Sequence, residues 1–195
     1  LITKGVAQRI KDIGVGYVGI SLDGLKDVND KFRGAPGAYE KAMKGIENCV
    51  AVGQRVGLRF TINQHNAREL DKIFDFIEAE NINRVCFYHL VYSGRGEAMV
   101  HDDLTHEESR AAMDTIIRRT KDYEARGLQK EILTVDNHCD GIYMYLKAKE
   151  AGDDAAADSR LNGHLKQLAG DIFLQLFTQA AGTGIRLIPV GNKAQ

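Results

Sequence analysis

The stretch that decides the fold is Tyr17 to Gly34, which reads YVGISLDGLKDVNDKFRG. It begins as a short apolar run, Tyr17 to Leu22, and then becomes a charged segment. This pattern predicts a buried parallel strand that ends in a loop. Ser21 and Asp23 would then stand at the carboxyl end of the strand, the end at which α/β sheets and barrels bind ligands. Arg33 follows in the charged segment, and its planar guanidinium suits a carboxylate.

A Ser-x-Asp-Gly strand end also has a plainer interpretation, since strands often finish in Asp-Gly turns. Further along the chain, Arg55 to Ile62 places alternate apolar side chains on one side and predicts a second strand. Thr61 and Asn63 finish this strand, at the same sheet edge as Ser21. Consecutive strand–helix units with short connections imply parallel strands and right-handed crossovers.

Helical spacing, caps and turn residues predict the remaining elements. Two capping boxes are expected, Asn66 with Glu69 and Thr105 with Glu108. We expect helices over residues 1–14, 38–52, 67–79, 106–126 and 142–149. We expect strands over 84–88, or up to 91, and over 131–135. A charged loop up to Pro36 and a polar linker over 152–158 complete the prediction.

Composition excludes several classes of protein. The 195 residues carry a net charge of −1 and are 44% hydrophobic, which is ordinary for a globular protein and gives no basic excess for nucleic acid or a membrane surface. No apolar run reaches the ~18 residues that a membrane span needs. We therefore expect a cytoplasmic protein with neither nucleic acid nor membrane as partner.

The three cysteines, Cys49, Cys86 and Cys139, are dispersed, which fits a reducing compartment better than a disulfide scaffold. No CxxC or CxxxCxxC motif occurs. Cys49 is interpreted as a small apolar residue of its helix face.

Three further features leave two interpretations open. The run Ser93 to Gly96 (SGRG) could bring an anion to the backbone, or it could be a glycine-rich loop with a solvated Arg95. His89 is either a core histidine or a cavity residue. The cluster Asp136, Asn137, His138 and Asp140 could perform acid/base chemistry or cap a turn into the next helix.

Taken together, the SLDG, DVND and FRG segments, the strand ending in TIN and the helix opening NARELDKIFDFI resemble the middle of a radical S-adenosylmethionine (SAM) enzyme. The stretches VCFYHLVYSGRG and ILTVDNHCDGIYMYLK look like the tetrapyrrole-modifying branch, in particular the enzymes of heme and heme d1 biosynthesis. The resemblance runs from about residue 1 to 160 and is dense through Gly96.

The resemblance implies an α/β fold that is part of a radical SAM (β/α)6 partial TIM barrel, with only the central and later strand–helix units present. It implies SAM and a [4Fe-4S] cluster as cofactors, the cluster ligands lying outside this chain, and an electron-supplying reductant as a partner. SAM would be cleaved to a 5′-deoxyadenosyl radical that takes a hydrogen atom from a tetrapyrrole, and propionate side chains would be removed or modified. No catalytic residue and no metal ligand is assigned.

Residue roles also follow from the resemblance. The SAM contacts would be Ser21, Arg33, Thr61, Asn63 and an apolar position near the adenine, Leu90 or Val91. The tetrapyrrole contacts would be His89, Arg95 and His138.

The resemblance also implies that the chain is a piece of a longer protein. We expect a barrel segment over residues 1–135, a helical connector over 136–161, and a tail over 162–195 that no longer resembles the family and could come from a shifted reading frame. Three alternatives stay open at this stage: a peptide-modifying radical SAM maturase, a barrel domain that has lost its cluster and its catalysis, and an ordinary phosphate-binding TIM barrel.

Overall fold

The structure is a computed structural model that describes residues 2–137 and 139–158. The described residues fall into two compact units, divided after Asn137, and the first contains the four-stranded sheet. The elements are α1 (Lys4–Asp12), β1 (Val18–Ser21), α2 (Asp27–Arg33), α3 (Ala38–Ala51), β2 (Val56–Thr61), η1 (Ala67–Glu69), α4 (Leu70–Ala79), β3 (Arg84–Tyr88), η2 (Gly94–Asp102), α5 (His106–Ala125), β4 (Glu131–Val135) and α6 (Cys139–Glu150).

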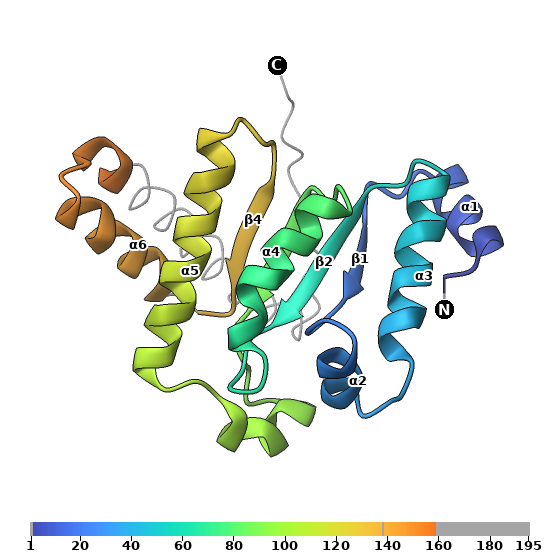
Figure 1. The fold of residues 1–195 in the computed structure, drawn as a ribbon, viewed down its shortest axis with the longest axis horizontal. Helices are drawn as coiled ribbons and strands as arrows, with labels where there is room; N and C mark the ends of the chain where they lie inside the picture. Colours follow the sequence, from blue (N-terminus) through green and yellow to red (C-terminus); the bar gives the residue numbers. More distant parts are fainter. Residues whose placement is uncertain (1, 138, 159–195) are drawn as a thin grey trace, which may run out of the picture. The chain divides into compact units, whose positions relative to one another are not determined.

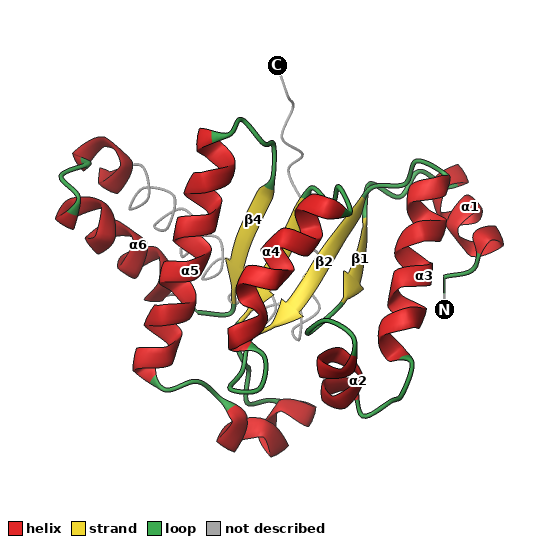
Figure 2. Ribbon diagram, in the orientation of Figure 1, coloured by secondary structure: helices red, strands yellow, loops and turns green. Residues whose placement is uncertain are grey.

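The sheet has four strands in the order β1-β2-β3-β4, and every neighbouring pair is parallel. In each interval between strands the chain passes through at least one helix, and α3, α4 and α5 lie along one face of the sheet (Figures 1 and 2). The predicted parallel strand–helix units are therefore confirmed. The expected α/β class and partial-barrel arrangement agree with this sheet.

Strand register separates the sheet into two faces of different chemistry. On the face toward the helices, Leu58 pairs with Val85 and Phe60 with Phe87, and all four side chains are buried. On the other face, Ser21 pairs with Arg59, and both are exposed. The period of two along each strand thus directs apolar residues into the core and leaves polar residues on the opposite face.

The centre of the core is a chain of aromatic rings. Phe87 stacks on Phe74 with centroids 5.4 Å apart and meets the edge of Phe60 at 5.7 Å. Phe74 also contacts Tyr123 of α5, whose hydroxyl donates to the Phe74 carbonyl oxygen. This cluster ties β2 and β3 to the two helices that follow them.

The expectation of a charged loop up to Pro36 was wrong in part, because residues 27–33 form the helix α2. Gly34 ends this helix in the left-handed conformation with φ 60°, and its amide donates to the Lys31 carbonyl oxygen at 3.1 Å. Asp27 lies in the first turn and Lys31 and Arg33 in the last, which complements the helix dipole. A helix of only seven residues is too short to show an apolar periodicity in the sequence.

One predicted capping box is confirmed and one is wrong. The Thr105 side chain accepts from the Glu108 amide at 3.2 Å, and the Glu108 carboxylate accepts from the Thr105 amide at 2.8 Å. Asn66 makes no side-chain cap, and the chain after it is the 3-10 turn η1 rather than the start of an α-helix. The Asn66 side chain serves instead in the network described below.

Other expected elements agree with the structure to within a few residues, except that residues 154–158 are helical where a polar linker was expected. The proposed tail over 162–195 lies outside the described residues. Among the residues that the structure describes, no helix is long and apolar enough to cross a membrane.

Asp30 connects α2 to the start of α3 and should make stability depend on pH. Its carboxylate accepts from the Gly37 amide at 2.5 Å and the Tyr39 amide at 2.7 Å, and these bonds hold the pKa of Asp30 below its ordinary value of 3.8. A lowered pKa in the folded state gives stability that is fully present above the ordinary pKa value and is lost as the pH falls through the lowered pKa.

We expect the difference in unfolding free energy between the wild type and Asp30→Asn to be constant near neutral pH and to shrink below about pH 4. Urea unfolding at several pH values would measure this difference. A difference that grows toward acid pH would contradict this account.

Candidate functional site

The carboxyl ends of the four strands point to one edge of the sheet, and α2 lies just beyond the end of β1 at that edge (Figure 1). The loop after β2 reaches the same region, since the Ile62 amide donates to the carbonyl oxygen of Tyr88, the last residue of β3. The sequence analysis placed Ser21, Thr61 and Asn63 here, and the structure confirms that all three stand at strand ends.

A buried polar network joins the loop after β1 to the loop after β2. Its centre is Asp23, which is completely buried. The Asp23 carboxylate accepts from the Thr61 amide at 2.7 Å and from the Arg33 guanidinium, while the Asp23 amide donates to Asn29 Oδ1 at 2.9 Å. Asn66 Nδ2 donates to the carbonyl oxygens of Asp23 at 3.0 Å and Thr61 at 2.8 Å. We call these five residues the Asp23 network; it fixes α2 against the end of β2.

Burial governs the electrostatics of this network. Removing the Asp23 carboxylate from water raises its pKa, and the Thr61 amide and the Arg33 guanidinium oppose that rise. The turn interpretation of Asp23 was too narrow, because the side chain connects two strand ends in addition to shaping a turn. Gly24 completes the turn with φ 153°, where a Cβ would come within 2.5 Å of Val28 Cγ1.

Arg33 has a partner that the sequence analysis did not give it. Its ion pair with Asp23 stays within the strand-end region, and the side chain remains 34% exposed. Because a guanidinium carries five N–H donors in a fixed plane, one bond to Asp23 orients the group and leaves other donors for a ligand. Arg33 thus lies at the predicted end of the sheet, held by a buried carboxylate.

Asn63, at this edge of the sheet, has a buried side chain with an unpaired hydrogen-bond donor. It is fully buried, its Oδ1 accepts from the His65 amide at 2.8 Å, and its Nδ2 makes no hydrogen bond. Buried amides are rarely left in this condition, and an ordered water or a bound group would satisfy this donor. The sequence pattern placed Asn63 at the strand end, and the family resemblance implied its role as a ligand contact.

The remaining predicted contacts follow β3. His89 and Leu90 are half-buried, and Val91 is 49% exposed. Arg95 lies in η2, and the structure describes only the backbone of this residue. His138 lies outside the described residues. No described contact brings these residues to Ser21 or Asn63, so their assignment stays a prediction.

The glycine-rich run after β3 is tightly folded. A Cβ at Gly96 would stand 2.0 Å from the Val91 carbonyl oxygen, so only glycine fits this approach. Gly94 adopts the left-handed conformation with φ 59°. The run begins the 3-10 helix η2 and is not an extended loop.

Within the described residues, no group of three or more His, Cys, Asp or Glu side chains could hold a metal ion. Cys49 and Cys86 are buried and Cys139 is exposed, and none forms a disulfide. Burial raises the pKa of Cys49, as befits the inert apolar role predicted for it. The donor set of this part of the chain does not fit an iron–sulfur cluster.

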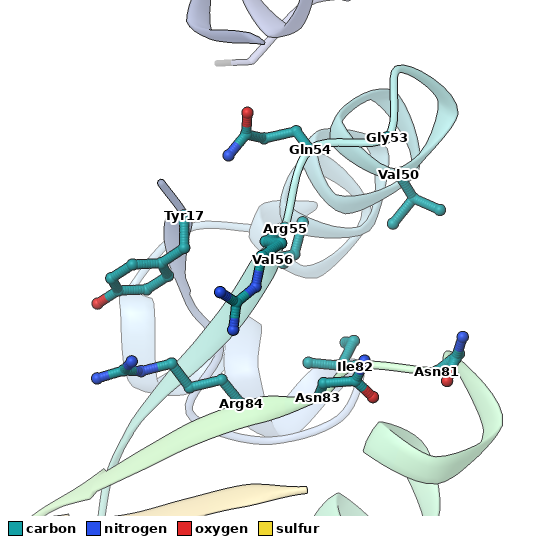
Figure 3. Close-up of a pocket in the computed structure, with 10 residues that line it drawn as sticks. All are labelled: Tyr17, Val50, Gly53, Gln54, Arg55, Val56, Asn81, Ile82, Asn83 and Arg84. Atoms are coloured by element: carbon teal, nitrogen blue, oxygen red, sulfur yellow. The ribbon is translucent and has the colours of Figure 1, made fainter. Parts of the chain in front are cut away.

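A cavity of about 230 Å³ lies at the other edge of the sheet, next to the amino ends of β2 and β3 (Figure 3). Its lining includes Tyr17, Gln54, Arg55, Asn83 and Arg84. The Arg84 guanidinium lies 4.8 Å from the centre of the Tyr17 ring and also pairs with Glu131. Ligands of parallel α/β sheets bind at the carboxyl ends of the strands, so this cavity is separate from the candidate site.

Sequence reasoning missed three contributors at the carboxyl edge. Asn29 and Asn66 are buried members of the Asp23 network, and His65 makes a contact with Asp102 of η2 at 2.9 Å. The cluster of asparagines in DVND and TINQHN was the available signal, since amide side chains often bond to the backbone of nearby turns. This cluster does not show which residues of the other loops the asparagine side chains bond to.

No family model matches the chain. It is 51% identical over 158 residues to Fe-coproporphyrin III synthase of Methanosarcina barkeri, which covers 81% of this chain and 40% of that protein. It is 38% identical over 180 residues to pre-heme d1 synthase of Dinoroseobacter shibae, covering 92% of this chain and 42% of that protein. The chain thus spans about two fifths of the length of these curated relatives.

Among solved structures, native anSMEcpe with bound AdoMet resembles the chain with a TM-score of 0.58 at 16% identity. The match covers 78% of this chain and 41% of that one. At this identity the likeness concerns the fold alone, and it agrees with the partial barrel expected from the sequence.

Proposed function

We propose that this chain, which belongs to the radical SAM enzymes related to heme-biosynthesis proteins, supplies SAM-binding strands of an enzyme that modifies a tetrapyrrole. The observation that carries this proposal is the 51% identity to Fe-coproporphyrin III synthase over 81% of the chain. The fold supports the barrel, and the polar strand ends support the location of the cofactor within it.

In this proposal the carboxyl edge of the sheet holds the polar end of SAM. The exposed Ser21 hydroxyl and the unpaired Asn63 amide can bond to its oxygen atoms, and Arg33, oriented by Asp23, can meet its carboxylate. Thr61 stands beside them at the end of β2, and Leu90 or Val91 would pack near the adenine. These donors match an anionic, oxygen-rich ligand.

The full protein would also hold a [4Fe-4S] cluster, with ligands that the described residues do not provide. Bound SAM supplies the reactive group for hydrogen-atom removal; the residues of this chain bind and orient it and exclude water. The reductant that would feed electrons to the cluster, and the cytoplasmic location, stay predictions from the sequence.

The substrate in this proposal is a tetrapyrrole with carboxylate side chains, and the reaction removes or modifies its propionates. The names of the two relatives, Fe-coproporphyrin III synthase and pre-heme d1 synthase, support this class of substrate. His89, Arg95 and His138 remain the proposed contacts from the sequence.

The SAM site can be tested at Ser21. We expect Ser21→Ala to weaken SAM binding by about two- to tenfold, the loss expected for one hydrogen bond, with no change in thermal stability because the side chain is exposed. Calorimetric titration of the purified protein with SAM measures the affinity. Ser109→Ala in α5 removes the same hydroxyl away from the strand ends and should change nothing. Absence of SAM binding by the wild-type protein, or equal affinities for the wild type and Ser21→Ala, would refute the assignment.

A further inference from the structure

A histidine–aspartate pair stands at the carboxyl edge of the sheet, outside every role assigned above. His65 Nε2 lies 2.9 Å from Asp102 Oδ1, and the two side chains are 57% and 37% exposed. His65 belongs to the loop after β2, two residues beyond Asn63, while Asp102 is the last residue of η2. The pair is therefore assembled from two loops that meet beside the proposed SAM site.

The loop that carries His65 is fixed on both sides. Asn63 Oδ1 accepts the His65 amide at 2.8 Å, and the Gln64 amide donates to the Asp102 carbonyl oxygen at 2.9 Å. Gln64 Nε2 donates to the Asp103 carbonyl oxygen at 2.6 Å. These bonds place the imidazole and the Asp102 carboxylate in contact without relying on their own attraction.

The geometry decides which nitrogen is available. Because Nε2 faces a carboxylate, it carries a proton in either charge state of the ring, and Nδ1, for which the described residues provide no hydrogen bond, is left for a ligand. In the neutral ring Nδ1 is an acceptor and repels a carboxylate; in the imidazolium it is a charged donor. The pair with Asp102 is then neutral overall when the ring is charged and carries −1 when it is not.

Neighbouring charges reinforce this dependence. The Asp103 carboxylate adjoins Asp102, where it accepts from the Tyr92 hydroxyl and, at 2.8 Å, from the Leu104 amide. The two carboxylates that the described bonds place near His65, those of Asp102 and Asp103, are acidic, so the imidazolium is the form of the ring that favours contact with an anion.

We propose that His65, positioned by Asp102, binds a carboxylate side chain of the tetrapyrrole through Nδ1 and does so only when the imidazole is protonated. This inference rests on the proposed function, because it adds a substrate contact to the same site. Asp102 is a positioning residue: its carboxylate holds the ring through Nε2.

The experiment titrates the purified protein with iron coproporphyrin III between pH 5.5 and about 8.5, a range that spans the ordinary titration of histidine. We expect the affinity of the wild type to fall by about ten- to hundredfold from low to high pH, as for loss of one charge-assisted hydrogen bond. His65→Gln should bind weakly with a flat profile. Asp102→Asn removes the carboxylate that holds Nε2 and should weaken binding at low pH while a pH dependence remains, whereas His65→Gln loses that dependence altogether.

Controls separate this inference from the proposed function. His106→Gln removes an exposed imidazole at the start of α5 and should keep the wild-type profile. SAM affinity, measured alongside, should be unchanged in His65→Gln. If the wild type binds iron coproporphyrin III equally at all pH values, or His65→Gln retains the wild-type profile, His65 is not the contact while the proposed function stands. If the wild type does not bind the porphyrin at any pH, both fail.

Discussion

Replacing Asp23 with alanine is expected to lower the free energy of unfolding by about 2–4 kcal/mol. The change leaves the Thr61 amide without its acceptor at a part-buried position and leaves Arg33 without its ion pair. An unsatisfied buried donor costs about 1–3 kcal/mol, and Arg33 adds less than a fully buried charge because its side chain is one-third exposed. Urea unfolding followed by circular dichroism measures the difference.

Two matched variants give this prediction its control. Asp23→Asn keeps an oxygen for the Thr61 amide but places an NH2 donor where the oxygen met Arg33, so it loses the ion pair and should still cost less than Asp23→Ala. Asp27→Ala removes an exposed carboxylate from the first turn of the same helix and should stay within about 0.5 kcal/mol of the wild type. Equal effects at Asp23 and Asp27 would show that the network does not hold the strand ends together.

The sheet could be predicted from the sequence because its signals are local. Val56, Leu58 and Phe60 alternate along one strand, and the register confirms that they share the buried face. The helix α2 could not be predicted, since its seven residues are held by tertiary contacts: Asn29 to the Asp23 amide, and Asp30 to the start of α3. A pattern search sees only a charged segment there.

The candidate site, too, could be predicted only in part from the sequence. Ser21, Thr61 and Asn63 were predicted because a strand end is a position that sequence can indicate. The roles of Asn66 and His65 depend on partners far away in the chain, since Asn66 bonds to Asp23 and His65 meets Asp102. Asn66 shows the limit most clearly. It matches a capping box in sequence, but its Oδ1, the atom that a cap would use, accepts from the Asn63 amide at 2.8 Å, and its Nδ2 donates to the carbonyl oxygens of Asp23 and Thr61.

The second large effect is expected in the core, at Phe87→Ala. Phe87 is fully buried between Phe74, with ring centroids 5.4 Å apart, and Phe60, at 5.7 Å. Truncation removes both ring contacts and leaves a cavity that the rigid strand β3 cannot close, so we expect the free energy of unfolding to fall by about 3–5 kcal/mol. Phe76→Ala makes the same deletion at a half-buried position of α4 and should lower the free energy of unfolding clearly less.

The same core substitution should also affect the candidate site, because β3 leads directly into the segment from His89 to Gly96. In Phe87→Ala this segment should open locally before global unfolding, and hydrogen exchange at its amides would detect the opening. Equal costs at Phe87 and Phe76, or unchanged exchange along that loop, would separate the aromatic core from the candidate site.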